Sequence, residues 1–531
     1  MSNKNYDIAV IGGGHNGLVC ANYLARAGLS VAVFEGRDQV GGCCTTDEIL
    51  PEYRNSTLAY SLNQFDKDVE QDLHLAHHGL KTLKRRTGAI SLLPDGRYLS
   101  IGAAPQDNHA EIAKFSEKDA DAHLAFRQEL DECAYILRRY MQRRAPNFSG
   151  GMNEIWDFFK AGRRFRRLSV SRKEKLMNLM TMSLGDYLDL WFDHDAIKGF
   201  YSAFGLLGNY VHPYASGSAY SLLQNLGEID GNARYVEGGM GALSSALVKS
   251  AESKGVEIFT GSSVQEVLTD TDQDRPVGHG IKLSDGRFIR AKRVVANCTP
   301  SVLYTQLLGE QNLPAGFLKR MRNYKYSSGT LKINVAMKDL PKFTALTSRG
   351  DQSVFLNRPI NICPSLEYAE RAFHDGRIRG FARRPVISMS IPTLSDPSLA
   401  PEGHHVASIM CQHYGFNLPD DLEWSNIVDE AVDDVFDLLE SHAPGFRDLV
   451  VGHTAVTPRE MEAKFGLTGG DIYHGAMQLN QMFAFRPAAK FADYRTPVEN
   501  LYICGAGAHP GGGVTGLPGK LCAAEVLKDA A

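Results

Sequence analysis

The stretch NYDIAVIGGGHNGLVCANYLARAGLSVAVFEGRDQVGGCC, residues 5–44, decides the fold class. Residues 8–11 form a short β-branched run that is stopped by glycine, which predicts a buried parallel strand. Residues 15–28 have helical spacing, and residues 29–34 form a second apolar run that ends in an acid. This order of strand, glycine turn, helix and strand predicts a βαβ unit at the start of an α/β domain.

The glycine pattern at the first turn predicts a dinucleotide site. Gly12 permits the tight turn, Gly14 lets backbone approach a pyrophosphate, and Gly17 allows close contact between helix and strand. The helix N-terminus, which begins with His15 and Asn16, offers free N–H groups to phosphates. Glu35 lies 18 residues after Gly17, where a carboxylate accepts hydrogen bonds from ribose hydroxyls. The predicted contacts are therefore Gly12, Gly14, His15, Asn16, Gly17 and Glu35.

Composition narrows the class of protein. The 531 residues suggest two or three domains, and 43% hydrophobic with 22% charged residues is ordinary for a globular enzyme. A net charge of −4 and a pI near 6.5 argue against nucleic-acid binding. The first residues lead directly into a strand and no apolar run approaches about 18 residues, so we expect a cytoplasmic protein. An organelle such as the mitochondrial matrix is left open.

A second glycine pair favours FAD over a nicotinamide dinucleotide as the cofactor. Arg37, Gly41 and Gly42 follow the acid and add a basic side chain and a second glycine loop beside the first. A nicotinamide site does not need this addition, whereas a longer dinucleotide has to be threaded past backbone. The pattern therefore predicts FAD.

The C-terminal stretch ENLYICGAGAHPGGGVTGLPGKLCAAEVL, residues 499–527, supplies a matching piece. Residues 501–504 are expected to form a strand and residues 521–527 a helix. The loop between them, which opens at Gly505, would aim at the isoalloxazine. Backbone N–H groups near Gly513, Val514 and Thr515 could then stabilise a reduced, anionic flavin.

These motifs resemble a known family. GGGHNGL…E…GG and GAGAHPGGGVTGLPG are similar to the phytoene-desaturase-like branch of the FAD-dependent amine oxidase and desaturase superfamily, and to its pyridine nucleotide-disulfide oxidoreductase domain-containing type. The resemblance implies an α/β protein with a Rossmann-like FAD-binding domain of the glutathione-reductase-like type and an inserted α+β substrate domain. The expected FAD-binding domain comprises residues 1–60, 230–305 and 480–531, and the substrate domain comprises residues 61–229 and 306–479. It also implies that Val264 lies next to the adenine.

Three residues are candidates for catalysis. The stretch SSGTLKINVAMKDLP, residues 327–341, resembles the strand on which flavin amine oxidases carry a lysine that holds a water at N5. Lys332 either enters the site, where burial would depress its pKa, or points to solvent. His509 lies in the C-terminal glycine loop and His474 in the HGAM stretch, and either could exchange protons near the flavin. Each could instead organise its loop. No metal-ligand set emerges.

We expect an FAD-dependent oxidoreductase that removes hydride from a C–H bond of a hydrophobic or amine-type substrate, with oxygen or a quinone as electron acceptor. The alternatives are a flavin amine oxidase that produces hydrogen peroxide, and a non-catalytic FAD-binding assembly protein. Homo-oligomerisation is left open. Residues 158–192 combine apolar residues with a basic cluster, which suggests either peripheral contact with an anionic membrane or a solvated helix face. The cluster comprises Arg163, Arg164, Arg166, Arg167, Arg172, Lys173 and Lys175.

Overall fold

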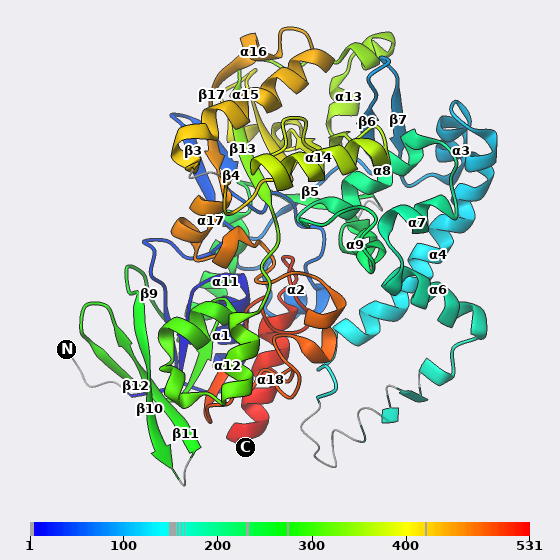
Figure 1. Cartoon of the computed structure of the whole chain (residues 1–531). Coiled ribbons are helices and arrows are strands. Elements are labelled where there is room, and N and C mark those ends of the chain that lie inside the picture. The colour runs from blue at the N-terminus through cyan, green and yellow to red at the C-terminus, as the bar shows by residue number, and fades with distance from the viewer. Residues whose placement is uncertain are drawn as a thin grey trace.

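The computed structural model describes residues 5–147, 156, 159–160, 162–163, 165–229, 233–272, 275–419 and 422–531. The chain forms two seven-stranded sheets that lie in separate lobes, with a group of helices beside them (Figure 1). Both termini lie on the lobe that contains the first sheet. The structure is an α/β fold with a Rossmann-like βαβ unit in its first sheet, as the sequence predicts. Among the helices of these residues, none combines the length and apolarity needed to cross a bilayer.

The first sheet contains the predicted βαβ unit. Its strand order is β10-β11-β12-β1-β2-β9, and β18 pairs with β12. Strands β9, β2, β1, β12 and β18 run parallel, whereas β10, β11 and the start of β12 form an antiparallel extension. The strands are β1 (Tyr6–Ile11), β2 (Val31–Phe34), β9 (Glu257–Phe259), β10 (Val264–Asp272), β11 (Arg275–Leu283), β12 (Phe288–Ala296) and β18 (Leu501–Ile503).

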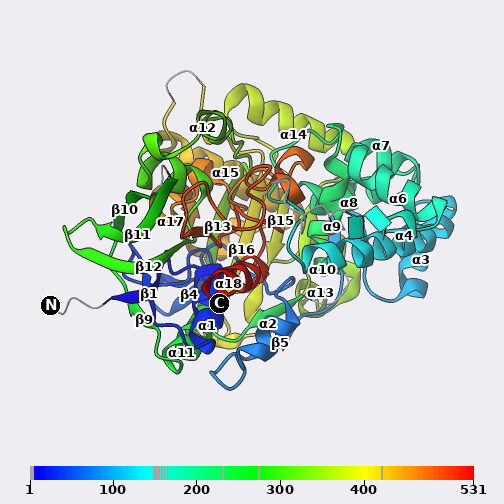
Figure 2. The ribbon, with the colours of Figure 1, turned by 90° about the horizontal axis from the view of Figure 1, so that it is seen from below.

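Helix α1 (His15–Arg26) packs between α11 (Gly241–Glu252) and α18 (Leu517–Ala530). Nearly the whole helix is buried, because small and apolar residues occupy almost all of its surface. Figure 2 shows α1, α11 and α18 close together under the first sheet. The predicted C-terminal strand, loop and helix are therefore confirmed as β18, the loop that follows it and α18, although α18 begins four residues earlier than expected.

The second sheet has the order β17-β13-β16-β15-β14-β6-β7. Helix α15 (Trp424–His442) packs against one face through its buried apolar side chains. All eight residues of β13 are buried, because the other face of the sheet is also covered. The strands are β6 (Ala89–Leu92), β7 (Tyr98–Ile101), β13 (Thr330–Met337), β14 (Ile360–Ile362), β15 (Ile387–Ser390), β16 (His405–Gln412) and β17 (Val450–Val456).

The third group is helical. Serine caps begin several of its helices, since the side chains of Ser116, Ser169 and Ser183 each accept a hydrogen bond from a backbone N–H. Most of the chain between residues 105 and 229 is helical, but β6 and β7, which precede it, join the second sheet. The helices are α3 (Pro105–Ala113), α4 (Glu117–Met141), α6 (Val170–Thr181), α7 (Leu184–Asp189), α8 (Asp195–Leu206) and, packed on α8, α14 (Leu366–Arg379).

Shorter elements connect these three parts. Two small antiparallel pairs are β3 (Thr46–Leu50) with β4 (Tyr53–Ser56), and β5 (Thr82–Lys84) with β8 (Arg234–Val236). The remaining α-helices are α2 (Lys67–Asp72), α9 (Ser221–Gln224), α10 (Leu226–Ile229), α12 (Ala315–Arg322), α13 (Ser353–Leu356), α16 (Phe446–Leu449) and α17 (Pro458–Phe465).

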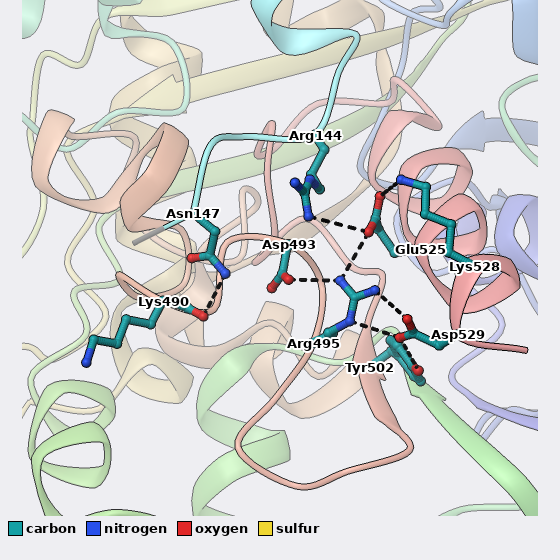
Figure 3. A network of polar contacts seen from close by, with 9 residues as sticks. All are labelled: Arg144, Asn147, Lys490, Asp493, Arg495, Tyr502, Glu525, Lys528 and Asp529. Atoms are coloured by element: carbon teal, nitrogen blue, oxygen red, sulfur yellow. Dashed lines mark hydrogen bonds and ion pairs between the residues drawn. The ribbon is translucent and has the colours of Figure 1, made fainter. Parts of the chain in front are cut away.

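A polar network fixes the C-terminal helix to the chain that precedes β18 (Figure 3). Arg495 lies at its centre and contacts three carboxylates: Asp493 at 2.8 Å, Glu525 at 3.0 Å and Asp529 at 2.7 Å. Arg144 adds a contact to Glu525 at 3.7 Å. The network therefore joins α18, the loop before β18 and the segment after α4.

Candidate active site

The glycine turn after β1 has the tight geometry that a dinucleotide site requires. Gly12 has a φ of +92°, which disfavours other residues there. A Cβ on Gly17 would lie 2.3 Å from the carbonyl oxygen of Gly12, so only glycine lets α1 approach the strand this closely. A Cβ on Gly14 would lie 2.7 Å from Nδ2 of Asn297. The turn thus leaves backbone open to a ligand.

Glu35 closes this turn from the end of β2. Its Oε2 accepts a hydrogen bond from the backbone N–H of Gly13 at 2.7 Å, and its Oε1 accepts one from the N–H of Arg37 at 3.0 Å. These two bonds hold the carboxylate at the edge of the turn. Its remaining lone pairs can accept hydrogen bonds from a bound ribose.

The second glycine loop lies against the first. The N–H of Gly41 donates to the carbonyl of Gly13 at 2.8 Å, and Gly14 and Gly41 form an isolated parallel bridge. Arg37 donates to the carbonyl of Gly42 at 3.3 Å, and its guanidinium lies over the ring of Phe465, 4.5 Å from the ring centre. The two loops therefore form one continuous surface.

One cavity runs from these loops to the second sheet. At the end nearer the glycine turn it is lined by Gly12, Gly14, His15, Asn16, Glu35, Arg37, Gly42 and Cys43. Towards its far end it is lined by Tyr60, Ser61, Asn63, Gln64, Leu207, Asn225, Met410, Tyr473 and His474. The far end thus combines residues from both sheets' lobes and from the helical group.

Only part of the predicted C-terminal contact set lines this cavity. Gly513 and Val514 do. Gly505 packs against the backbone of Asn297, and the Thr515 hydroxyl accepts from the N–H of Leu517 at the start of α18. Val264 begins β10 and packs against the core of the first lobe. Gly505, Thr515 and Val264, like Gly17 and Gly41, are therefore not among the residues that line the cavity.

Lys332 is fully buried, so the solvent-facing alternative is wrong. Its Nζ donates to Oδ1 of Asn334 at 2.5 Å and to Oγ of Ser408 at 2.7 Å. It also lies 5.8 Å from the ring centre of Tyr60, which lines the cavity. Burial lowers the pKa of this amine to about 7, as the sequence analysis expects for an inward-pointing lysine. Lys332 therefore lies just behind the cavity wall.

His474 lines the cavity, with a φ of +58° and an Nδ1 that has no hydrogen-bond partner among the described residues. Burial lowers its pKa to about 3, and the nearby His15 and Arg486 act in the same direction. Burial likewise lowers the pKa of His15 to about 4. Both imidazoles are therefore neutral at pH 7 and can donate or accept a hydrogen bond.

His509 lies elsewhere. It is buried but does not line the cavity, and its ring lies 6.3 Å from the ring of Phe483, between ring centres. Its surroundings include the backbone of Tyr140 and Arg143 at the end of α4. Position in the glycine loop alone was a poor guide, because neighbouring residues of an irregular loop point in different directions.

Sequence reasoning missed Arg486, which is fully buried. Its guanidinium donates to the carbonyls of Tyr473 at 2.6 Å, Ala506 at 2.9 Å and Gln481 at 3.1 Å. It thus holds the loop that carries His474 against the loop after β18. Little in the sequence indicated this, because arginine is rarely fully buried and a single arginine in FAFRP is expected at the surface.

This cavity fits a flavin dinucleotide. The glycine turn and the α1 N-terminus suit a pyrophosphate, and Glu35 suits a ribose. The far end has the size and the mixed lining that a ring system and a substrate need.

Comparisons with known proteins also indicate a flavin-binding protein. Residues 17–527 match the family described as flavin containing amine oxidoreductase. Pyridine nucleotide-disulfide oxidoreductase domain-containing protein 2 of Rattus norvegicus is 34% identical over 99% of this chain and 94% of its own length. Phytoene desaturase of Neurospora crassa is 24% identical over 98% of this chain and 83% of its own length.

The fold is shared with solved structures. An oxidoreductase from Methanosarcina mazei superposes with a TM-score of 0.61 at 17% identity, over 99% of this chain and all of that one. Putrescine oxidase bound to putrescine superposes with a TM-score of 0.62 at 15% identity, over 99% of each chain. The family match, the 34% identical relative and the cavity lead to one conclusion: the chain belongs to the flavin-containing amine oxidoreductases, and is an FAD-dependent oxidoreductase.

Proposed function

We propose that this enzyme removes hydride from a C–H bond of a substrate bound at the far end of the cavity, and that oxygen reoxidises the cofactor. The observation that best supports this proposal is one cavity that extends from the dinucleotide turn to a wall of polar and apolar side chains next to the buried Lys332. Bound FAD supplies the hydride acceptor. The names of the relatives, which include phytoene desaturase and putrescine oxidase, support a hydrophobic or amine-type substrate.

The residues around the cavity would bind the cofactor, orient the substrate and keep water away from both. The turn at Gly12 and Gly14 would hold the pyrophosphate, and Glu35 the adenosine ribose. The backbone at Gly513 and Val514 would face the isoalloxazine. On the cavity wall, His474 has an Nδ1 without a hydrogen-bond partner among the described residues, and its neutral imidazole can hydrogen-bond a ligand and help to orient it.

Lys332 would act in the reoxidation half of the cycle. Its amine has a pKa of about 7, because burial disfavours the charge, so an appreciable fraction is protonated at neutral pH. A positive charge close to the site where oxygen is reduced stabilises developing negative charge. Reduction of FAD by the substrate develops no such charge on oxygen.

The test is the Lys332→Met variant, studied by stopped-flow in both half-reactions. We expect reoxidation by oxygen to slow at least ten-fold, while reduction by a substrate found in an anaerobic screen changes little. Lys338→Met is a matched control, since Lys338 is exposed just beyond the end of β13. Equal reoxidation rates in all three proteins would contradict the role of Lys332 and favour a quinone or protein as acceptor. A flavin that no amine, acyl chain or polyene reduces would favour the non-catalytic alternative.

We also propose that the enzyme contacts anionic membranes through a basic groove beside α4. The groove is lined by Glu132, Tyr135, Ile136, Arg139, Tyr140, Arg143, Arg167, Leu168 and Arg172, so four guanidinium groups face one carboxylate. Tyr135 and Val170 nearby are 64% and 80% exposed. Arg164 of the predicted cluster lies outside the described residues. The wild type should co-sediment with vesicles that contain phosphatidylserine but not with vesicles of phosphatidylcholine alone, and Arg143→Glu should not co-sediment with either. Equal sedimentation of the wild type and Arg143→Glu with the phosphatidylserine vesicles would contradict this contact.

A further inference from the structure

The basic groove beside α4 is lined on one side by a single face of that helix. The lining residues on this side recur at intervals of three and four, so they share one face of α4 and of the turn that follows it. The opposite side is the chain that leads into α6, which packs against α4 (Figure 1). The groove has a volume of about 330 Å³. The first side is formed by Glu132, Tyr135, Ile136, Arg139, Tyr140 and Arg143, and the opposite side by Arg167, Leu168 and Arg172.

The carboxylate that lines this groove, Glu132, is already paired. It accepts a hydrogen bond from Nε of Arg172 at 2.5 Å and one from Nζ of Lys175 at 3.4 Å. Both bonds join α4 to α6 at one end of the groove. The bond from Arg172 and the charge of that residue hold the pKa of Glu132 below its ordinary value. Glu132 is therefore ionised at pH 7, and its charge is balanced by these two cations.

Three guanidinium groups line the groove without such a partner. Arg139, Arg143 and Arg167 form no ion pair with any residue that the structure describes. Arg143 lies roughly three helical turns further along the chain than Glu132, so that carboxylate does not reach it. The C-terminus of α4 opposes the three cations with only about half a negative charge, so about 2.5 positive charges remain.

A compact dianion matches this excess of positive charge. Guanidinium groups bind phosphate oxygens through pairs of parallel hydrogen bonds, and a phosphomonoester offers three terminal oxygens to three such groups. It carries about −1.5 to −2 charges at pH 7, whereas a phosphodiester carries one. Ile136, Tyr140 and Leu168 also line the groove, and they would contact the apolar remainder of the ligand.

We infer that the groove is a binding site for one phosphomonoester group, held by Arg139, Arg143 and Arg167 and carried by a lipid headgroup or by a small soluble molecule. This inference rests on the proposed membrane contact, because it names the anionic group that the same groove recognises. It differs from general attraction to a negative surface, since the number of charges on one phosphate decides the affinity.

The lipid arm of the test uses the FAD-loaded full chain and vesicles of equal total charge. One set contains phosphatidic acid, which is a phosphomonoester, and the other contains twice the fraction of phosphatidylserine, which is a diester. The remainder of both is phosphatidylcholine. If the ligand is a lipid, the wild type should bind the phosphatidic acid vesicles about ten-fold more tightly in co-sedimentation.

The soluble arm compares glycerol 3-phosphate with glycerophosphoglycerol, a diester with the same backbone, by isothermal titration calorimetry. We expect the monoester to bind about ten-fold more tightly. A preference for phosphatidic acid vesicles identifies the lipid headgroup as the source. A preference for glycerol 3-phosphate without a preference between the vesicles identifies a soluble phosphomonoester.

Arg139→Gln and Arg143→Gln each remove one guanidinium from the groove and should weaken binding of the monoester about ten-fold. Both residues are exposed, so the variants should fold normally. Arg138→Gln is the matched control, because Arg138 is the exposed neighbour of Arg139 in the last turn of α4 and does not line the groove. It removes the same charge and should change the affinity less than about two-fold.

Two results would overturn the inference. One is a wild type that distinguishes monoester from diester in neither arm, and the other is a loss of binding in Arg138→Gln as large as that in the two groove variants. Failure of the proposed membrane contact gives a different result: none of the vesicles would sediment the protein, while glycerol 3-phosphate would still bind more tightly than the diester.

Discussion

Replacing Lys332 with methionine should stabilise the protein near neutral pH, although it removes two hydrogen bonds. The pKa of this amine falls from an ordinary value of 10.5 to about 7 on folding, because burial disfavours the charged form. One pKa unit corresponds to about 1.4 kcal/mol, so the buried lysine costs about 5 kcal/mol of folding stability at pH 7 and below. Methionine has a similar length and carries no such cost.

Two losses reduce this gain. The hydrogen bonds to Asn334 and Ser408 contribute about 1 kcal/mol each, and leaving these partners less well satisfied costs about 1 kcal/mol more. Asn334 keeps its bond to the carbonyl of Thr57 at 3.2 Å, which limits that last penalty. The expected net gain at pH 7 is therefore about 2 kcal/mol.

The sign of the effect depends on pH. Above 10.5 the lysine is neutral in both the folded and unfolded states, so its burial costs nothing from charge. As pH falls from 10.5 to about 7, the unfolded lysine takes up a proton that the folded one does not, and stability of the wild type is lost. Lys332→Met should thus be about 2 kcal/mol more stable than wild type at pH 7 and about 2 kcal/mol less stable at pH 10, where little charge cost remains to be relieved.

Urea unfolding at pH 7 and pH 10 measures both differences, with Lys338→Met as the exposed control. A destabilised Lys332→Met at pH 7, or a difference that is the same at both pH values, would refute the reasoning. Together with slower reoxidation, a gain in stability would mean that this lysine is retained for chemistry at the expense of folding.

Three further predictions concern the cofactor and the fold. Glu35→Ala removes the acceptor for the N–H groups of Gly13 and Arg37, and should weaken FAD retention by about 1–3 kcal/mol. The release of fluorescent flavin measures this retention, and a value equal to wild type would contradict the prediction. Gly17→Val places a side chain within 2.3 Å of a carbonyl oxygen, and the purified protein should lack flavin absorbance, so a yellow variant would contradict the tight turn. Arg495→Met removes the ion pair of the nearly buried Asp493 and one of the cations around the nearly buried Glu525, which keeps Arg144 and Lys528. It should cost about 3 kcal/mol in urea unfolding, whereas Arg322→Met, at an exposed ion pair, should cost less than about 1 kcal/mol; similar costs would contradict the network in Figure 3.

The sequence was sufficient for the opening βαβ unit because its signals are local. The turn at Gly12, the acid at Glu35 and the helix between them lie within one short stretch, so spacing alone constrains their geometry. The strand around Lys332 was expected too, because residues 327–341 resemble the lysine-bearing strand of flavin amine oxidases.

The features that could not be predicted depend on contacts between residues far apart in the sequence. Strands β6 and β7 join a sheet whose other members begin more than 200 residues later, and no local pattern predicts that partner. The burial of Lys332 depends on Ser408 in a neighbouring strand and on Tyr60 in a distant loop. The direction of His509 depends on the end of α4, which sequence reasoning did not place beside it. The domain boundaries at residues 60, 230, 305 and 480 remain predictions.

The position of β18 in the first sheet has a consequence for how the protein is made. The turn after β1 emerges from the ribosome long before β18, α18 and the loop between them, which follow β1 by about 490 residues. Until they are made, β12 lacks its neighbour β18, and α1 lacks one of the two helices that cover it. We therefore expect a chain that stops before residue 501 to have an incomplete first core and to retain FAD poorly.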